Sequence, residues 1–203
     1  MEIKNKELKR RIIEISYKNK LSHIGSCLTA VDIIKEIYDI KKPDEKFVLS
    51  SGHAGLALYV VIEEKTRKDA EAIFAHHGVH PDRCSSCFLD CSTGSLGQGL
   101  PIGVGMALAD RSKNVYCLIS DGECAEGSIW EAMRIKHEQK LDNLKVFLNH
   151  NGWAAYKPTG PIAFPLEMAH RHTTNELPFL EGQDAHYKVM TDDDKSIAME
   201  ILK

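Results

Sequence analysis

Short apolar runs alternate with helix-like segments along most of the chain. Residues 47–50, 115–119 and 145–148 have the length and apolar character of buried strands. Around them, apolar residues recur at helical spacing, with polar residues between them. The expected helices lie at residues 5–18, 30–38, 54–64, 67–76, 97–109 and 129–139. Strands that alternate with helices predict an α/β fold, in which helices cover both faces of a parallel sheet.

The pattern is weaker after residue 150. Residues 167–172 are expected to form a short helix at best, residues 188–190 a last strand, and residues 193–202 a closing helix. The sequence has no internal repeat and no low-complexity tract. A chain of 203 residues is long enough for one domain with a substantial core. We therefore expect a single domain over residues 1–203.

Composition and charge exclude several classes of protein. Hydrophobic residues make up 43% and charged residues 27%, as in ordinary globular proteins. The net charge is −3 and no long basic run is present, so nucleic acid is not an expected partner. No apolar run approaches the roughly 20 residues that cross a bilayer. The start of the chain is charged, without the apolar core of a signal peptide, and we expect a cytoplasmic protein with free cysteines.

Polar residues follow two of the predicted strands. Asp121 comes soon after the run 115–119, and residues 149–151 (NHN) follow the run 145–148. The helix between the runs makes the two strands parallel neighbours, and ligands of such sheets bind at the carboxyl ends of the strands. Carboxylate, amide and carbonyl oxygens suit Mg²⁺ or Ca²⁺. Spacing alone leaves two interpretations, a metal-bound diphosphate site and a polar turn with a helix N-cap.

Four segments, in this order, resemble the motifs of the transketolase family. Residues 22–25 (SHIG), 49–54 (LSSGHA) and 92–99 (STGSLGQG) are similar to the family's S-H-x-G, L-S-x-G-H-A and T-G-x-L-G-Q-G. Residues 120–122 (SDG), with Asn151 thirty residues after Asp121, resemble its thiamine diphosphate motif, although serine replaces the first glycine. Residues 181–184 (EGQD) resemble a later family segment. Four motifs in family order are specific where one alone is weak, and they imply the thiamine-diphosphate-binding fold.

The resemblance also implies roles for individual residues. Asp121 and Asn151 would bind Mg²⁺ (or Ca²⁺) through their side chains, and Trp153 through its backbone carbonyl. The implied catalytic residues are His23, His53, His80 and Glu126, the last in a proton network between two cofactors. The implied cofactor contacts are His53, Gly94, Ser95, Leu96, Gly122, Glu123 and Asn151. The other histidines, His186 among them, are expected at the surface or in packing.

Family membership implies an activity and a partner. The expected reaction transfers a two-carbon ketol unit from a ketose phosphate to an aldose phosphate, with thiamine diphosphate and Mg²⁺. The chain is too short for the family's pyrimidine-binding domain, so the resemblance implies a C-terminally shortened amino-terminal subunit of a split transketolase. It would act with a separate carboxy-terminal, pyrimidine-binding subunit, as a homodimer or heterotetramer. Two alternatives are thiamine-dependent carboligation on an unusual sugar and a non-catalytic cofactor-binding subunit. The sequence does not identify the donor, the acceptor or the partner.

Three cysteines form a cluster in the predicted loop 78–92. Cys84, Cys87 and Cys91 have the spacing C-x2-C-x3-C, and two histidines, His76 and His77, precede them. Three thiols and an imidazole can bind Zn²⁺ tetrahedrally. The spacing lacks a second pair of cysteines, and we favour free thiols in this loop over a zinc site.

Overall fold

The computed structural model describes residues 3–160 and 168–203. Four parallel strands form one sheet in the order β1-β2-β3-β4. The strands are β1 (Lys46–Leu49), β2 (Val115–Ser120), β3 (Leu144–His150) and β4 (Met168–His172). Because every pairing is parallel, the carboxyl ends of all four strands meet at one edge of the sheet. The predicted α/β fold is confirmed, and the predicted strands at residues 47–50, 115–119 and 145–148 correspond to β1, β2 and β3.

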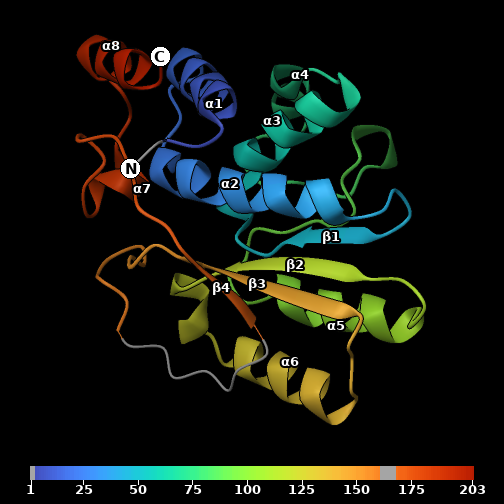
Figure 1. Cartoon of the computed structure of the whole chain (residues 1–203). Coiled ribbons are helices and arrows are strands. Elements are labelled where there is room, and N and C mark those ends of the chain that lie inside the picture. The colour runs from blue at the N-terminus through green and yellow to red at the C-terminus, as the bar shows by residue number, and fades with distance from the viewer. Residues whose placement is uncertain (1–2, 161–167) are drawn as a thin grey trace.

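Helices cover both faces of the sheet (Figure 1). One side carries α1 (Lys6–Lys18), α2 (Ile24–Ile40), α3 (Gly55–Thr66), α4 (Ala70–His77) and α8 (Asp192–Ile201). The other side carries α5 (Gly99–Ala109) and α6 (Gly127–Glu138). The short elements are η1 (Gly52–Ala54), η2 (Ser85–Cys87), η3 (Gly122–Ala125) and α7 (Asp184–Tyr187).

Strand β2 explains why both faces are covered. Its first five residues are all buried, as expected for a central strand with helices on each side. Tyr116 and Leu118 belong to the apolar core beneath α1–α4, whereas Cys117 and Ile119 belong to the core beneath α5 and α6. The two cores therefore follow from the alternation of side chains along one apolar run.

Strand β4 differs from the sequence-based expectation of a short helix. Residues 168–172 form a strand, and residue 167 of the predicted helix lies outside the described residues. The strand pairs with β3 from Val146 opposite Met168 to His150 opposite His172. Arg171 on β4 also makes a two-pronged ion pair with Glu36 of α2, with an Nε–Oε2 distance of 3.0 Å. The predicted strand at residues 188–190 is wrong, since these residues have no strand conformation and pair with none of the strands among residues 3–160 and 168–203.

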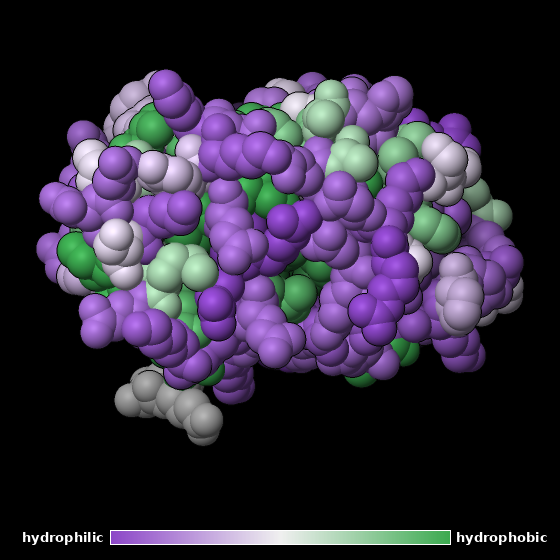
Figure 2. Space-filling view, turned by 90° about the horizontal axis from the view of Figure 1, so that it is seen from above, coloured by the Kyte–Doolittle hydropathy of each residue, from purple (hydrophilic) through white to green (hydrophobic). Residues whose placement is uncertain are grey.

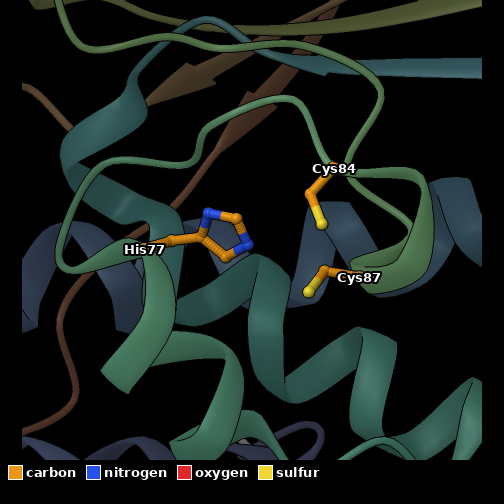
Figure 3. Close-up of side chains that lie close together, drawn as sticks. All are labelled: His77, Cys84 and Cys87. Atoms are coloured by element: carbon orange, nitrogen blue, oxygen red, sulfur yellow. The ribbon is translucent and has the colours of Figure 1, made fainter.

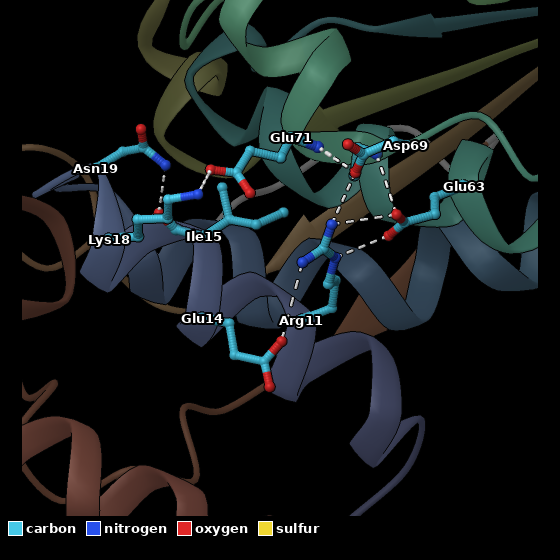
Figure 4. Close-up of polar contacts among 9 residues, drawn as sticks. Arg11, Glu14, Ile15, Lys18, Asn19, Glu63, Asp69 and Glu71 are labelled. Carbon is cyan, nitrogen blue, oxygen red and sulfur yellow. Dashed lines mark hydrogen bonds and ion pairs between the residues drawn. The ribbon is translucent and has the colours of Figure 1, made fainter.

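A polar network fixes α1 against α3 and α4 (Figure 4). The Arg11 guanidinium donates from Nε to Glu63 at 3.0 Å and from a terminal nitrogen to Asp69 at 2.8 Å. Asp69 also caps α4, accepting a hydrogen bond from the backbone N–H of Glu71. One arginine thus joins three helices, and the neighbouring carboxylates raise its pKa.

The surface seen in Figure 2 is largely hydrophilic, with apolar side chains scattered among polar ones. Within residues 3–160 and 168–203, no helix combines the length and apolar character needed to cross a bilayer.

Two glycines of α5 are expected to respond in opposite ways to alanine. A Cβ on Gly99 would lie 2.5 Å from the Cα of Ser50, which is backbone and cannot turn away, whereas a Cβ on Gly105 would meet nothing within 4 Å. Gly99→Ala should therefore cost about 1–3 kcal/mol of unfolding free energy. Gly105→Ala should stabilise by up to about 1 kcal/mol, because alanine is the better helix former. Urea unfolding of both variants checks the pair, and equal effects would contradict it.

Candidate functional site

A pocket of about 200 Å³ lies at the carboxyl edge of the sheet. Segments that follow β1, β2 and β3 form part of its wall, as expected for ligand sites of parallel sheets. The start of α2, the loop before α5, and α7 complete it. The lining residues are His23, Ser26, Ser51, His53, Ala54, His80, Gly94, Leu96, Ser120, Gly122, Asn149, Asn151, Trp153, Ala154, Ala155 and His186.

The loop that carries Gly94 and Leu96 is anchored to the end of β1. The Thr93 hydroxyl donates a hydrogen bond of 2.6 Å to the carbonyl of Leu49. A Cβ on Gly52 would lie 2.7 Å from the carbonyl carbon of Thr93, so the two segments are in direct backbone contact. The loop and the turn of His53 therefore form adjoining walls of the pocket.

Asp121 ties the end of β2 to the turn that follows β3. Its carboxylate is buried and accepts hydrogen bonds from the backbone N–H of Gly152 at 2.7 Å and from the Thr159 hydroxyl at 2.9 Å. Burial raises the pKa of this carboxyl, and the hydrogen bonds oppose the rise. Asn151, in the same turn, accepts through its side-chain oxygen from the backbone N–H of Trp153 at 2.9 Å.

The oxygens around this turn are those that a hard divalent cation prefers. A Cβ on Gly122 would lie 3.3 Å from the Cα of Ala154 and 3.8 Å from the carbonyl oxygen of Trp153. Glycine at position 122 therefore leaves space between the end of β2 and the backbone at Trp153 and Ala154. A carboxylate, an amide oxygen and a carbonyl are typical of Mg²⁺ or Ca²⁺ ligands. The residues present fit a metal-bound diphosphate.

Three histidines face one another across the pocket. The ring centroid of His23 lies 5.4 Å from that of His53 and 4.2 Å from that of His186, and the last two are 5.3 Å apart. The backbone N–H of His23 donates to the carbonyl of His186 at 2.7 Å. His80 lines the same pocket at its exposed rim. Burial, together with the smaller effect of neighbouring histidines, lowers the pKa of His53 to about 3 and that of His23 to about 4. These imidazoles are therefore neutral near pH 7.

His186 was missed by the sequence analysis, which placed it at the surface or in packing. It enters the pocket because α7 packs closely on the start of α2. A Cβ on Gly25 would lie 2.7 Å from the Cβ of Ala185, so only glycine permits this approach. The signal available in the sequence was the position of His186 two residues after the segment 181–184, which resembles a family motif.

The histidine group should make folding stability sensitive to acid. An unfolded histidine has a pKa near 6.5, whereas the folded values of His53 and His23 are about 3 and 4. As pH falls from about 6.5 toward these values, the unfolded state binds more protons and stability is lost. The loss from His53 alone amounts to about 2 kcal/mol at pH 5, so His53→Gln should reduce the fall in Tm between pH 7.5 and pH 5 by about 4–8 °C. The exposed His172→Gln, outside the pocket, is the control, and equal changes would contradict the expectation.

Four residues of the predicted site do not line the pocket, and one of them is Asp121, whose carboxylate faces Gly152 and Thr159. Ser95 and Glu126 are both exposed. Glu126 packs against the loop before α5, where a Cβ on Gly97 would lie 2.7 Å from the Cβ of Glu126. Glu123 is fully buried and accepts hydrogen bonds from the Ser50 hydroxyl at 2.6 Å and the backbone N–H of Gly97 at 2.9 Å. Its carboxylate supports the pocket wall from behind.

The cysteine cluster also differs from the predicted set. Cys91 is buried in the core beneath α5 and α6, whereas Cys87 belongs to the core on the other side of the sheet. In the described part of the chain, the side chains close enough to share a metal ion are His77, Cys84 and Cys87. The less favoured alternative, a zinc site made of Cys84, Cys87 and Cys91, is therefore not supported, because Cys91 is buried in the core beneath α5 and α6.

Comparisons with known proteins agree with this geometry. Residues 18–187 match the family model described as the transketolase thiamine diphosphate binding domain. The chain is 34% identical to an apulose-4-phosphate transketolase subunit from Phocaeicola vulgatus, over 74% of this chain and 60% of that protein. It is 33% identical to a 6-deoxy-6-sulfo-D-fructose transketolase subunit from a Clostridium species, over 71% of this chain and 60% of that protein.

The match to full-length transketolases is shorter. Human transketolase is 37% identical over 64% of this chain, a region that covers 24% of the human protein. The crystal structure of transketolase from Campylobacter jejuni superimposes with a TM-score of 0.64 and 25% identity, over 82% of this chain and 31% of that one. The chain thus spans less than two thirds of the length of each of these relatives.

Proposed function

Because this chain belongs to the transketolase family, we propose that it supplies the diphosphate-binding half of a thiamine-diphosphate-dependent transketolase. The proposed reaction transfers a two-carbon ketol unit from a ketose phosphate to an aldose phosphate. One observation supports it above all. Asn151 and Trp153, which follow β3, line one pocket together with the histidines His23, His53 and His80, although these residues belong to segments far apart in the sequence. Asp121 lies directly behind this wall, where its carboxylate accepts a hydrogen bond from the backbone N–H of Gly152.

In this proposal the cofactor is held mainly by the ends of β2 and β3. Asp121, Asn151 and the carbonyl of Trp153 would bind Mg²⁺ or Ca²⁺, and Gly122 would allow the diphosphate to approach the backbone. Gly94 and Leu96 would contact the aminopyrimidine ring. Ser95 and Glu123 remain proposed contacts, although neither lines the pocket. When bound, thiamine diphosphate supplies a nucleophilic carbon and an electron sink for breaking the bond next to a carbonyl.

The histidines would handle the protons and orient the sugar. A neutral imidazole donates a hydrogen bond from one ring nitrogen and accepts a proton at the other. The burial of His53 would let it do this away from bulk water, and the ring of His23 lies 5.4 Å from it. His80 at the rim would contact hydroxyl groups of the substrate. We place Glu126, outside the pocket, in a proton network at a contact between subunits.

We further propose that residues 1–203 act as one domain and work with a separate pyrimidine-binding subunit in the cytoplasm, as a homodimer or heterotetramer. The pocket of about 200 Å³ is smaller than the roughly 300–1,000 Å³ of most ligand sites, which favours completion by a second domain. Two relatives are themselves named as transketolase subunits. Their names specify unusual sugars, which favours carboligation on such a sugar as the second candidate.

The test is turnover by a reconstituted complex. The chain is co-purified with a pyrimidine-binding subunit encoded nearby, and consumption of ketose phosphates is measured with and without thiamine diphosphate and Mg²⁺. Turnover only in the complete mixture is the expected result. A complex that binds the cofactor but turns over only apulose 4-phosphate or 6-deoxy-6-sulfo-D-fructose, the sugars in the relatives' names, would select the second candidate. A complex that binds the cofactor without turning over any of these sugars would identify a non-catalytic subunit.

A further inference from the structure

His77, Cys84 and Cys87 lie together outside the pocket. His77 is the last residue of α4, Cys84 directly precedes the turn η2, and Cys87 is the last residue of that turn. One ligand atom of each residue, a ring nitrogen or a sulfur, lies within 4.8 Å of the other two. Figure 3 shows one ring nitrogen of His77 turned toward the two sulfur atoms.

The backbone between the cysteines holds both thiols on one side. Cys84 and Leu89 exchange two backbone hydrogen bonds of 2.9 Å, which close the loop into a tight knuckle. Inside it, the backbone N–H of Cys87 donates to the carbonyl of Cys84 at 3.1 Å. A C-x2-C pair in such a turn is the arrangement from which proteins present two thiolates to one metal ion.

The side chains are suited to a metal of intermediate softness. The Nε2 atom of His77 is buried and has no hydrogen-bond partner among the described residues, which is costly unless another group binds it. Cys87 is 5% exposed, so its thiol is shielded from solvent. The sulfur of Cys84 lies 3.2 Å from the hydroxyl oxygen of Ser86, which helps to fix the position of this thiol.

We propose that His77, Cys84 and Cys87 bind one Zn²⁺ ion, with water as the fourth ligand. Tetrahedral bonds of about 2.3 Å to sulfur and 2.0–2.1 Å to nitrogen place ligand atoms roughly 3.6–3.8 Å apart. The ligand atoms of His77, Cys84 and Cys87 now lie within 4.8 Å of one another, and small side-chain rotations would bring them into that range. Two thiolates and an imidazole favour Zn²⁺ over Mg²⁺ or Ca²⁺, which prefer oxygen. This site is separate from the oxygen ligands proposed for the cofactor metal.

The ion would clamp the loop that forms one wall of the pocket. The ligands bracket residues 78–83, which include His80 and Pro81. The carbonyl of Pro81 accepts a hydrogen bond of 3.0 Å from the backbone N–H of Thr93, in the loop that carries Gly94. Zinc would therefore hold α4, the knuckle and the pocket loop together. The proposed binding of zinc does not depend on the proposed activity.

The experiment measures zinc binding to the whole chain, kept reduced and stripped with a chelator. Equilibrium dialysis against Zn²⁺ should give one ion per chain, and Co²⁺ should give the thiolate charge-transfer band and visible bands of a tetrahedral site. Cys84→Ser, Cys87→Ser and His77→Gln should each weaken binding by more than the roughly 100-fold that loss of an outer-shell partner costs. Cys91→Ser is the matched control, a cysteine of the same loop outside the site, and should bind zinc like the unchanged chain.

Thermal unfolding gives a second measurement. Free Zn²⁺ at 100 times its Kd should raise Tm by about 5–10 °C in the unchanged chain and in Cys91→Ser, and not in Cys84→Ser. Absence of the charge-transfer band in the unchanged chain would overturn the proposal, even if a variant fails to fold. So would zinc binding that survives Cys84→Ser, or that is lost in Cys91→Ser. None of these outcomes depends on turnover, so they are distinguishable from failure of the proposed reaction.

Discussion

Asp121→Asn is expected to weaken Mg²⁺-dependent binding of thiamine diphosphate by at least about 100-fold, because it removes a charged ligand from the proposed metal site. The carboxylate lies at the end of β2 and already accepts hydrogen bonds from Gly152 and Thr159. The amide is nearly the same size, so the change removes charge with little change in packing. Calorimetric titration of the cofactor at a fixed Mg²⁺ concentration, with the partner subunit present, measures the loss.

Thr159→Val separates the two roles of this carboxylate. It removes the hydroxyl that donates to Asp121 at 2.9 Å and leaves the charge in place. We expect less than about a tenfold loss of cofactor affinity, since a neutral hydrogen bond contributes about 1 kcal/mol. Unchanged affinity in Asp121→Asn would remove Asp121 from the metal site. Equal losses in both variants would mean that Asp121 serves only to hold the turn.

Glu123→Gln is expected to lower the free energy of unfolding by about 2–4 kcal/mol, because it leaves buried donors without a charged acceptor. The side chain is fully buried and accepts from the hydroxyl of Ser50 and the backbone N–H groups of Gly97 and Ser120. An amide can accept at only one of its two ends, so its NH₂ group meets other donors. Urea unfolding followed by circular dichroism measures the change, which corresponds to a Tm lower by roughly 5–15 °C.

Glu138→Gln is the matched control. Glu138 ends α6 and pairs with Arg134 at 2.7 Å, but both side chains are half exposed or more. Such pairs contribute little, so the variant should stay within about 0.5 kcal/mol of the unchanged chain. An equally small change in Glu123→Gln would contradict the expectation. The hydrogen bonds of this carboxylate to the end of β1, the end of β2 and the loop at Gly97 would then contribute little to stability.

Local patterns were enough to predict the centre of the fold and most of the pocket. The apolar runs of β1, β2 and β3 form strands that are buried on both faces. Helices connect one strand to the next, and such connections make neighbouring strands parallel. Parallel strands place their carboxyl ends together, so the positions of His53, Gly122 and Asn151 near one another followed from the sequence. The family motifs added His23, His80 and Gly94, which lie at the same pocket.

Contacts between distant segments decided the rest. Residues 168–172 have no strand pattern of their own and become β4 by pairing with β3. His186 joins the pocket because α7 lies against Gly25 of α2, and Glu123 turns inward because donors from three segments meet its carboxylate. His77 meets Cys84 and Cys87 through the fold of a loop, while Cys91, close in sequence, is buried elsewhere. Periodicity reports which face of an element is buried, but only packing decides which elements meet.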